Sequence, residues 1–326
     1  MRSVAARSEP LPNKACPNEA DHAIMRHFLD KPGFLLARID QICTSLYGDL
    51  SSGETLAQAE ILLLSDALGA TPQVALARAA GIDTSTTAYV LANLAARNLV
   101  TRRADAGDRR RTVVALSAEG EARNSRIKAD YDGLQQLLLA PLEPGARPRL
   151  GRLLARIATH EAGPAPVFAP VAGALDGAPS LLCRRALQLF QARFIASTSA
   201  FNLTPRQFSL LFILTRTEAI TQVRFARLFG LDPSTCAVIM RNLAKRKLLA
   251  SSPSRDDGRA LDYRLTPAGH DAVLGATPLV DESEHLVFLD TAPGDVAWLV
   301  RQFQHLVHAH SHRLRFPGAL AVRPSR

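Results

Sequence analysis

Two short stretches of the sequence combine hydroxyl, amide and basic side chains in an order that suits recognition of DNA. The first stretch is expected to form a helix with these outward residues: Thr84, Ser85, Thr86, Tyr89 and Asn93. The second carries Ser234, Thr235, Val238, Arg241, Asn242 and Lys245 in the same arrangement. Hydroxyl groups bond phosphates or base edges, Asn pairs with adenine and Arg pairs with guanine. These residues are candidate contacts in the major groove.

A basic segment follows each of these stretches. Residues 99–103 and 112–116 are rich in β-formers and flank a polar turn, which predicts a hairpin, and residues 248–252 and 261–265 repeat the pattern. The candidate DNA contacts on the two hairpins are Arg103, Asp108, Arg109, Arg110, Arg111, Arg255, Asp257 and Arg259. Such hairpins suit contacts to the DNA backbone and to a narrow minor groove. A polar helix face alone is more simply explained by exposure to solvent, and the hairpin is what favours DNA.

Apolar residues at helical spacing indicate how the two stretches are held. Thr87, Val90, Leu91 and Leu94 recur at i, i+3, i+4 and i+7, as do Cys236, Ile239, Met240 and Leu243. These positions are predicted to face the core. Asp83 and Asp232 are expected to cap the two helices, and Gly81 and Gly230 to end the helices before them.

The whole arrangement occurs twice at a spacing of 149 residues. The segment that begins at Gly81 resembles the segment that begins at Gly230, and no gap is needed from about Thr55 to the helix after Pro144. Each copy is predicted to have six helices, with the hairpin between the fourth and the fifth. Thr71 and Thr221 are expected to cap the third helix, with Pro72 in its first turn, and Ser117 and Thr266 to cap the fifth.

The duplication sets the expected domain organisation. Residues 1–21 are predicted to be a tail, 22–162 the first domain, 163–180 a linker rich in Pro, Gly and Ala, 181–316 the second domain, and 317–326 a basic tail. Only 6% of the residues are aromatic, which favours a mainly α fold with small β-wings. The formal charge of +9 suits a polyanionic partner, although basic proteins of other classes share it.

The segment from Gly81 to Gly120 resembles the recognition helix, wing and following helix of the MarR family, and the segment from Gly230 to Gly269 resembles them slightly less well. The resemblance implies two tandem winged helix-turn-helix domains in a transcriptional regulator, here a repressor. It also implies that Asp108 orients Arg110, and Asp257 orients Arg259, for entry into the minor groove. Gly258 stands where the family often has a second Arg.

Family members pair through their first, fifth and sixth helices, so the two copies are expected to form an intramolecular pseudo-dimer, as a monomer or a further homodimer. Because Tyr89 corresponds to Val238 and Ala92 to Arg241, we expect an asymmetric operator. The resemblance also implies a small, aromatic effector, for which Arg38, Tyr47 and Arg193 are weak candidate contacts.

Other function classes are less favoured. A protein-interaction scaffold with degenerate winged helices is the main alternative, because the first recognition helix has no basic residue before Arg97. Redox sensing through Cys183, or metal binding by His308 and His312, is a further alternative with simpler structural explanations. No nucleophile motif or phosphate loop indicates an enzyme, and no cofactor is expected. Unpaired cysteines, with no signal peptide or long apolar run, predict a cytoplasmic protein without membrane contact.

Overall fold

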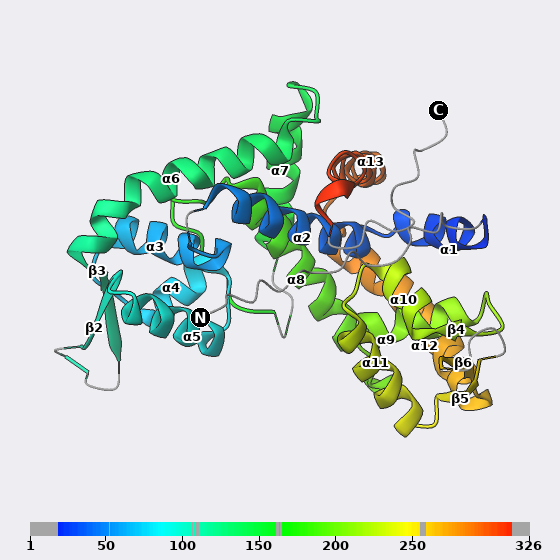
Figure 1. The fold of residues 1–326 in the computed structure, drawn as a ribbon. Helices are drawn as coiled ribbons and strands as arrows, with labels where there is room; N and C mark the ends of the chain where they lie inside the picture. Colours follow the sequence, from blue (N-terminus) through cyan, green and yellow to red (C-terminus); the bar gives the residue numbers. More distant parts are fainter. Residues whose placement is uncertain are drawn as a thin grey trace, which may run out of the picture.

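The computed structural model describes residues 19–51, 53–105, 107–108, 111–160, 163, 165–254 and 259–314, and it contains two halves with one order of elements (Figure 1). The first half comprises α1 (Glu19–Leu29), α2 (Pro32–Leu50), α3 (Leu56–Leu68), β1 (Thr71–Pro72), α4 (Gln73–Ala80), α5 (Thr84–Ala96), β2 (Val100–Ala104), β3 (Thr112–Leu116), α6 (Ala118–Leu139) and α7 (Ala146–Ala158). The second comprises α8 (Pro179–Ser197), η1 (Ser199–Phe201), α9 (Pro205–Leu214), β4 (Ile220–Thr221), α10 (Gln222–Phe229), α11 (Pro233–Lys245), β5 (Leu249–Pro253), β6 (Leu261–Leu265), α12 (Pro267–Val287), α13 (Pro293–Ala309) and η2 (Ser311–Arg313).

Most of the predicted helix ends are confirmed. The side chains of Ser117 and Thr266 accept hydrogen bonds from Gly120 N and Gly269 N at the starts of α6 and α12. Thr221 caps α10 in the same way. The prediction for α4 is wrong, because Pro72 is its N-cap and Thr71 lies in β1, so this helix has no side-chain cap.

Each wing is a three-stranded antiparallel sheet rather than the predicted two-stranded hairpin. The strand orders are β1-β3-β2 and β4-β6-β5, with Arg103 opposite Val113 and Ser252 opposite Asp262. The additional strands β1 and β4 have two residues each, which is too short for a periodic pattern in the sequence. They join the start of α4 and α10 to the wing, so the helix-turn-helix and its wing are one unit.

Glycine is required where each wing meets the long helix that follows it. A Cβ built on Gly120 would lie 2.1 Å from the carbonyl oxygen of Leu99, and one on Gly269 would lie 2.1 Å from that of Leu248. Both distances are far below a possible contact. The close approach fixes β2 against α6, and β5 against α12.

The two halves are joined by helices from the ends of each copy. α2 and α8 pack against each other in the middle of the molecule, with α13 against α2 and both α7 and α12 against α8 (Figure 1). A single cluster of buried apolar side chains runs through both halves. The predicted internal pseudo-dimer is therefore the architecture of the chain.

Some features near the predicted domain boundaries were not expected. α1 begins at Glu19, within the segment predicted as a tail, and α8 begins at Pro179, within the predicted linker. The basic tail at 317–326 lies outside the described residues. Among the helices that the structure describes, none is both long and apolar enough to cross a bilayer.

Candidate DNA interface

The first recognition helix, α5, has the predicted orientation. Its buried residues are Thr87, Val90, Leu91 and Leu94. Thr84, Ser85, Thr86 and Tyr89 are exposed and Asn93 is half-buried, and the side chain of Tyr89 is the most prominent apolar group, at 71% exposure. The outward face of α5 is therefore free for a partner, and it carries no charge before Arg97.

Asp83 organises the start of α5. Its carboxylate accepts hydrogen bonds from Thr86 N (2.8 Å), from Thr86 Oγ1 (2.6 Å) and from the hydroxyl of Ser85. These bonds from Ser85 and Thr86 lower the pKa of Asp83 to about 2. The two hydroxyl protons are thus committed to the cap, so in this arrangement the hydroxyls can only accept from DNA bases.

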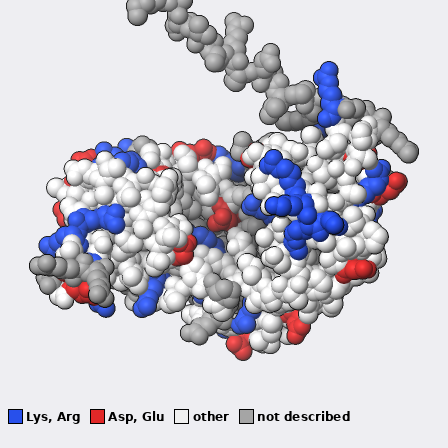
Figure 2. Space-filling view, turned by 90° about the horizontal axis from the view of Figure 1, so that it is seen from below, with Lys and Arg blue, Asp and Glu red and all other residues white. Residues whose placement is uncertain are grey.

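The second recognition helix, α11, has a different surface on the same framework. Cys236, Ile239, Met240 and Leu243 are buried as predicted. Ser234, Val238, Arg241, Asn242 and Lys245 are exposed and Thr235 is half-buried. Ser234 Oγ donates to Asp232 at 2.7 Å, which repeats the cap of α5. Figure 2 shows the molecule from below, and Lys and Arg gather there in the region where Figure 1 places α11.

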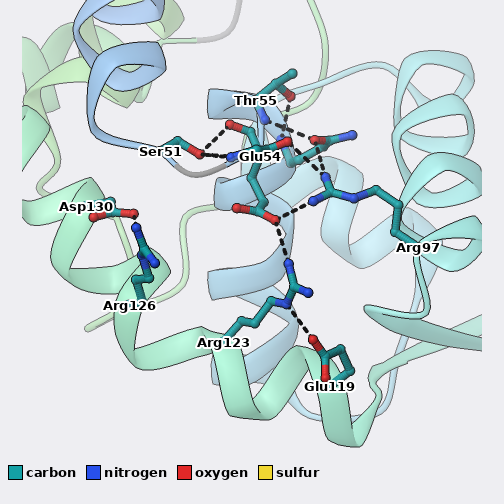
Figure 3. Close-up of polar contacts among 10 residues, drawn as sticks. Ser51, Glu54, Thr55, Arg97, Glu119, Arg123, Arg126 and Asp130 are labelled. Atoms are coloured by element: carbon teal, nitrogen blue, oxygen red, sulfur yellow. Dashed lines mark hydrogen bonds and ion pairs between the residues drawn. The ribbon is translucent and has the colours of Figure 1, made fainter.

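The Arg that ends each recognition helix supports the fold instead of extending the basic face. Arg97 donates to Glu54 Oε1 (2.6 Å) and to the carbonyl of Gly53, and Arg123 of α6 approaches the same carboxylate at 3.7 Å (Figure 3). Arg246 donates to the carbonyls of Phe201 and Asn202 at 2.7 and 2.8 Å. Arg246 therefore ties the end of α11 to the loop before α9.

Some basic residues of the wings are exposed, and some bond to neighbouring side chains. Arg103 is exposed on β2, while Arg102 reaches Gln73 at 3.4 Å. Arg111 Nε lies 3.5 Å from Asp108 Oδ2. In the second wing Arg259 is exposed, and Arg264 is held by Ser252 at 2.9 Å. Four predicted contacts lie outside the described residues: Arg109, Arg110, Arg255 and Asp257.

The two DNA-facing units share one side of the molecule. Figure 1 shows α5 and α11 both on the lower side, with the β2–β3 wing at one outer end and the β5–β6 wing at the other. A pair of recognition helices flanked by outward wings is the arrangement that lets a dimer read two successive half-sites. Here a single chain supplies both units.

Of the three residues considered as effector contacts, the structure places one beside a cavity that the sequence did not predict. Arg38 is buried beside this cavity, which lies between α1 and α2 of the first half and α8, α9, α10 and α12 of the second. Tyr47 is buried at 1% exposure, and neither it nor Arg193 lines that cavity. Sequence reasoning missed the phenylalanines of the cavity, because they come from helices that are far apart along the chain.

The residues considered for redox or metal sensing have other surroundings. Cys183 is buried in α8, and burial raises its pKa to about 12, so the thiol stays protonated and is a weak nucleophile. In the part of the chain that the structure covers, no three His, Cys, Asp or Glu side chains are grouped so as to hold a metal ion. His310, which lies between the candidate ligands His308 and His312 in the sequence, bonds the carbonyl of Leu138 at 3.1 Å and links the end of α13 to α6.

Comparison with known proteins agrees with this geometry. The MarR family model matches residues 55–112 and again 203–261, each of which covers a helix-turn-helix and part of its wing. An uncharacterised HTH-type transcriptional regulator of Bacillus subtilis, YdcH, is 26% identical over 114 residues, which are 34% of this chain and 78% of YdcH.

Solved structures with similar folds include a probable transcriptional regulator from Pseudomonas aeruginosa, at 28% identity and a TM-score of 0.37, over 39% of this chain and 94% of that one. Another is Bordetella bronchiseptica BpsR, whose DNA binding is regulated by 6-hydroxynicotinic acid, at 29% identity and a TM-score of 0.35, over 37% of this chain and 89% of BpsR. The two family matches, one on each helix-turn-helix and part of its wing, together with the curated relative, support a tandem MarR-family transcriptional regulator.

Proposed function

We propose that this regulator is a repressor that binds one asymmetric operator through two unequal winged helices of a single chain. The observation that carries the proposal is the placement of α5 and α11 on one side of the molecule, with the wings outside them (Figure 1). The pseudo-dimer thus supplies the geometry that relatives obtain by pairing two chains.

The expected asymmetry of the operator follows from the exposed residues. α11 presents Arg241 and Lys245, whereas the corresponding positions of α5 are Ala92 and Ala96. Arg favours guanine through paired hydrogen bonds, and a small apolar residue favours the thymine methyl group. The half-site under α11 is therefore expected to contain a guanine that the half-site under α5 lacks.

We further propose that a small aromatic ligand controls DNA binding and that the protein acts in the cytoplasm. The support for a ligand is a cavity between the central helices and the second winged helix. A ligand that binds better to one arrangement of the winged helices than to another shifts the population toward that arrangement. Release of the operator is the expected result for a repressor.

The main rival is a scaffold in which the first winged helix no longer binds DNA. A variant with Arg109, Arg110 and Arg111 changed to Ala separates the two functions. If the first wing contacts DNA, affinity falls and the dependence of log K on log salt becomes shallower, because fewer counterions are released. An unchanged affinity and salt slope would remove the first wing from the interface and favour the scaffold.

A further inference from the structure

The corner between α4 and α5 of the first winged helix is bound by residues of the other copy. α4 ends at Gly81, which has a left-handed backbone conformation with φ 61°, and Ile82 N donates to the carbonyl of Ala77 at 2.9 Å. The last carbonyl groups of a helix have no partner within the helix. Here α8 and the linker before it supply donors for several of them, so hydrogen bonds join the corner to the second half.

Two side chains of α8 donate to these carbonyl groups. Arg184 Nη2 lies 2.9 Å from the carbonyl oxygen of Ala80. Gln188 Nε2 lies 2.8 Å from that of Gly81. The second nitrogen of the Arg184 guanidinium pairs with Glu60, which is fully buried in α3. α8 therefore holds both α3 and α4, and its bond to Gly81 lies only three residues before the start of α5.

The linker binds the same corner. Ala169 N donates to the carbonyl of Arg78 at 2.9 Å, and the half-buried ring of Phe168 lies against Gly81. A Cβ built on Gly81 would be 3.0 Å from Phe168 Cδ2, so the ring touches the backbone at this point. Residues 165–169 therefore follow the surface of the first winged helix and make specific contacts with it.

Arg185 of α8 fixes the linker and Gln188 together. Its side chain is buried and donates to the carbonyls of Pro166, at 2.7 Å, and of Ala158 at the end of α7, at 3.3 Å. It also reaches Gln188 Oε1 at 3.5 Å, while the amide nitrogen of Gln188 donates to the corner. A planar guanidinium presents its donors in fixed directions, so one side chain orients both partners. Residues 165–169 with Arg184, Arg185 and Gln188 are called the linker clamp below.

The second winged helix is bound by the corresponding segment of the first copy, through different contacts. α1 precedes α2 as the linker precedes α8, and it reaches α10, where Asp21 accepts from Arg224 at 2.7 and 2.9 Å. The ring of Phe28 packs edge to face on Phe229, with centroids 4.9 Å apart. Each winged helix is thus held by the segment that leads into the central helix of the other copy. On the first winged helix, the linker takes the place of α1.

From these contacts we propose that the linker clamp positions the first recognition helix. It fixes α5 relative to α11, and thereby sets the separation of the two half-sites that one chain reads. The inference rests on the proposed binding of one operator by both winged helices. A clamp at the corner is sufficient, because β1 joins the start of α4 to the wing and the winged helix moves as one unit. The linker exists only because the two copies are joined in one chain.

A fixed separation favours one spacing of the DNA half-sites. A chain that already holds both recognition helices in the binding arrangement loses less freedom on binding than a chain in which one of them moves. Two extra base pairs between the half-sites move one of them by roughly 7 Å and rotate it by roughly 70° about the duplex axis. We therefore expect a clamped chain to discriminate strongly between the two DNAs, and an unclamped chain to discriminate less.

The distance between the two recognition helices tests the clamp without DNA. Spin labels at A92C and R241C occupy corresponding exposed positions of α5 and α11, and double electron–electron resonance measures their separation. The full chain also carries C16S, while Cys43, Cys183 and Cys236 are buried and remain. We expect one narrow distribution of distances for this protein.

Two double variants are then compared in the labelled chain. F168A/Q188A removes the ring and one donor of the clamp, and V167A/Q136A truncates the exposed neighbour of Phe168 and an exposed glutamine of α6 as a matched control. We expect the distribution to become at least about 1.5-fold wider in F168A/Q188A, because lost contacts free the first winged helix, and to stay unchanged in the control. An unchanged distribution in folded F168A/Q188A would overturn the inference.

Operator binding by the unlabelled proteins tests the consequence for DNA. Each protein is titrated with the operator that the wild-type chain selects, and with the same operator carrying two extra base pairs between its half-sites. We expect wild type and control to bind the longer DNA at least about tenfold more weakly, and this ratio to fall at least about threefold in F168A/Q188A. A general loss of stability lowers the melting temperature without changing the ratio. If the double variant does not fold, Q188A alone decides, and an unchanged ratio in the folded variant would refute the positioning role.

The two measurements separate failure of this inference from failure of the proposed function. If the wild-type chain selects no specific DNA site, the proposed function falls, and the distance distribution still decides whether the clamp holds α5. If a site is selected but F168A/Q188A keeps both the distances and the spacing ratio of wild type, only the clamp is refuted.

Discussion

Arg184 of α8 and Glu60 of α3 form a buried ion pair that joins the two copies of the repeat. The pair connects the central helix of the second half to the first winged helix. Ala37 and Ser209 stand at the positions that correspond to Arg184 and Glu60 in the other copy, and these two residues cannot form an ion pair. We expect R184M to destabilise the fold by about 3–5 kcal/mol, because it leaves a carboxylate buried without its cation. Urea denaturation at neutral pH measures this loss.

The double variant E60M/R184M provides the matched comparison for that prediction. Since apolar residues often replace a buried ion pair at little cost, the double variant should be more stable than R184M alone. R126M, which removes an exposed partner of Asp130 on α6, should change stability by less than about 1 kcal/mol. A double variant as unstable as R184M would show that packing around Arg184, and not its charge, holds the copies together.

The glycine at the start of α6 gives a second stability prediction. G120A should destabilise the fold by about 1–3 kcal/mol or more, because the new methyl group would overlap the carbonyl of Leu99 and force the wing to move. G151A, in the middle of α7 with no atom near its Cβ position, should be stabilising by about 0.5–1 kcal/mol. Equal effects of the two changes in thermal melts would refute the close contact.

The charged face of α11 predicts an electrostatic share of DNA binding. R241A/K245A should weaken operator binding and reduce the slope of log K against log salt by roughly 2, if both side chains contact phosphates. If Arg241 reads a base, the slope falls by roughly 1 and discrimination at that base relaxes. R126A/K128A, which removes two charges from α6, is the control and should leave the slope unchanged. Fluorescence anisotropy over a salt series measures all three proteins.

The cap of α5 predicts a pH-dependent contribution to stability. The hydrogen bonds to Asp83 hold its pKa at about 2, below its usual 3.8, so the ionised cap stabilises the fold above pH 3.8 and this benefit is lost as pH falls toward 2. D83A should cost about 1 kcal/mol at pH 7, and less as the pH falls through 3.8. D66A, on the exposed side of α3, should stay within about 0.5 kcal/mol of wild type. A D83A effect that is constant with pH would contradict the capping role.

The elements that follow local rules were predictable from the sequence. The buried positions of α5 and α11 follow from periodicity, and the caps at Asp83, Asp232, Ser117 and Thr266 follow from cap chemistry. The internal pairing was implied by the family resemblance, once the repeat had shown two copies. The roles of Arg97 and Arg246 were not predictable, because their acceptors lie more than 40 residues away. The cavity could not be predicted either, because its lining residues come from helices that are far apart along the chain.

The central claim is that one chain carries two unequal DNA-reading units, and selection of random duplex DNA by the purified protein at several salt concentrations tests it most directly. Sizing of the selected complex gives the number of chains on each site. The account predicts an asymmetric site of two half-sites occupied by one chain, with guanine under α11. Enrichment of a symmetric palindrome that needs two chains, or of no sequence at all, would contradict it.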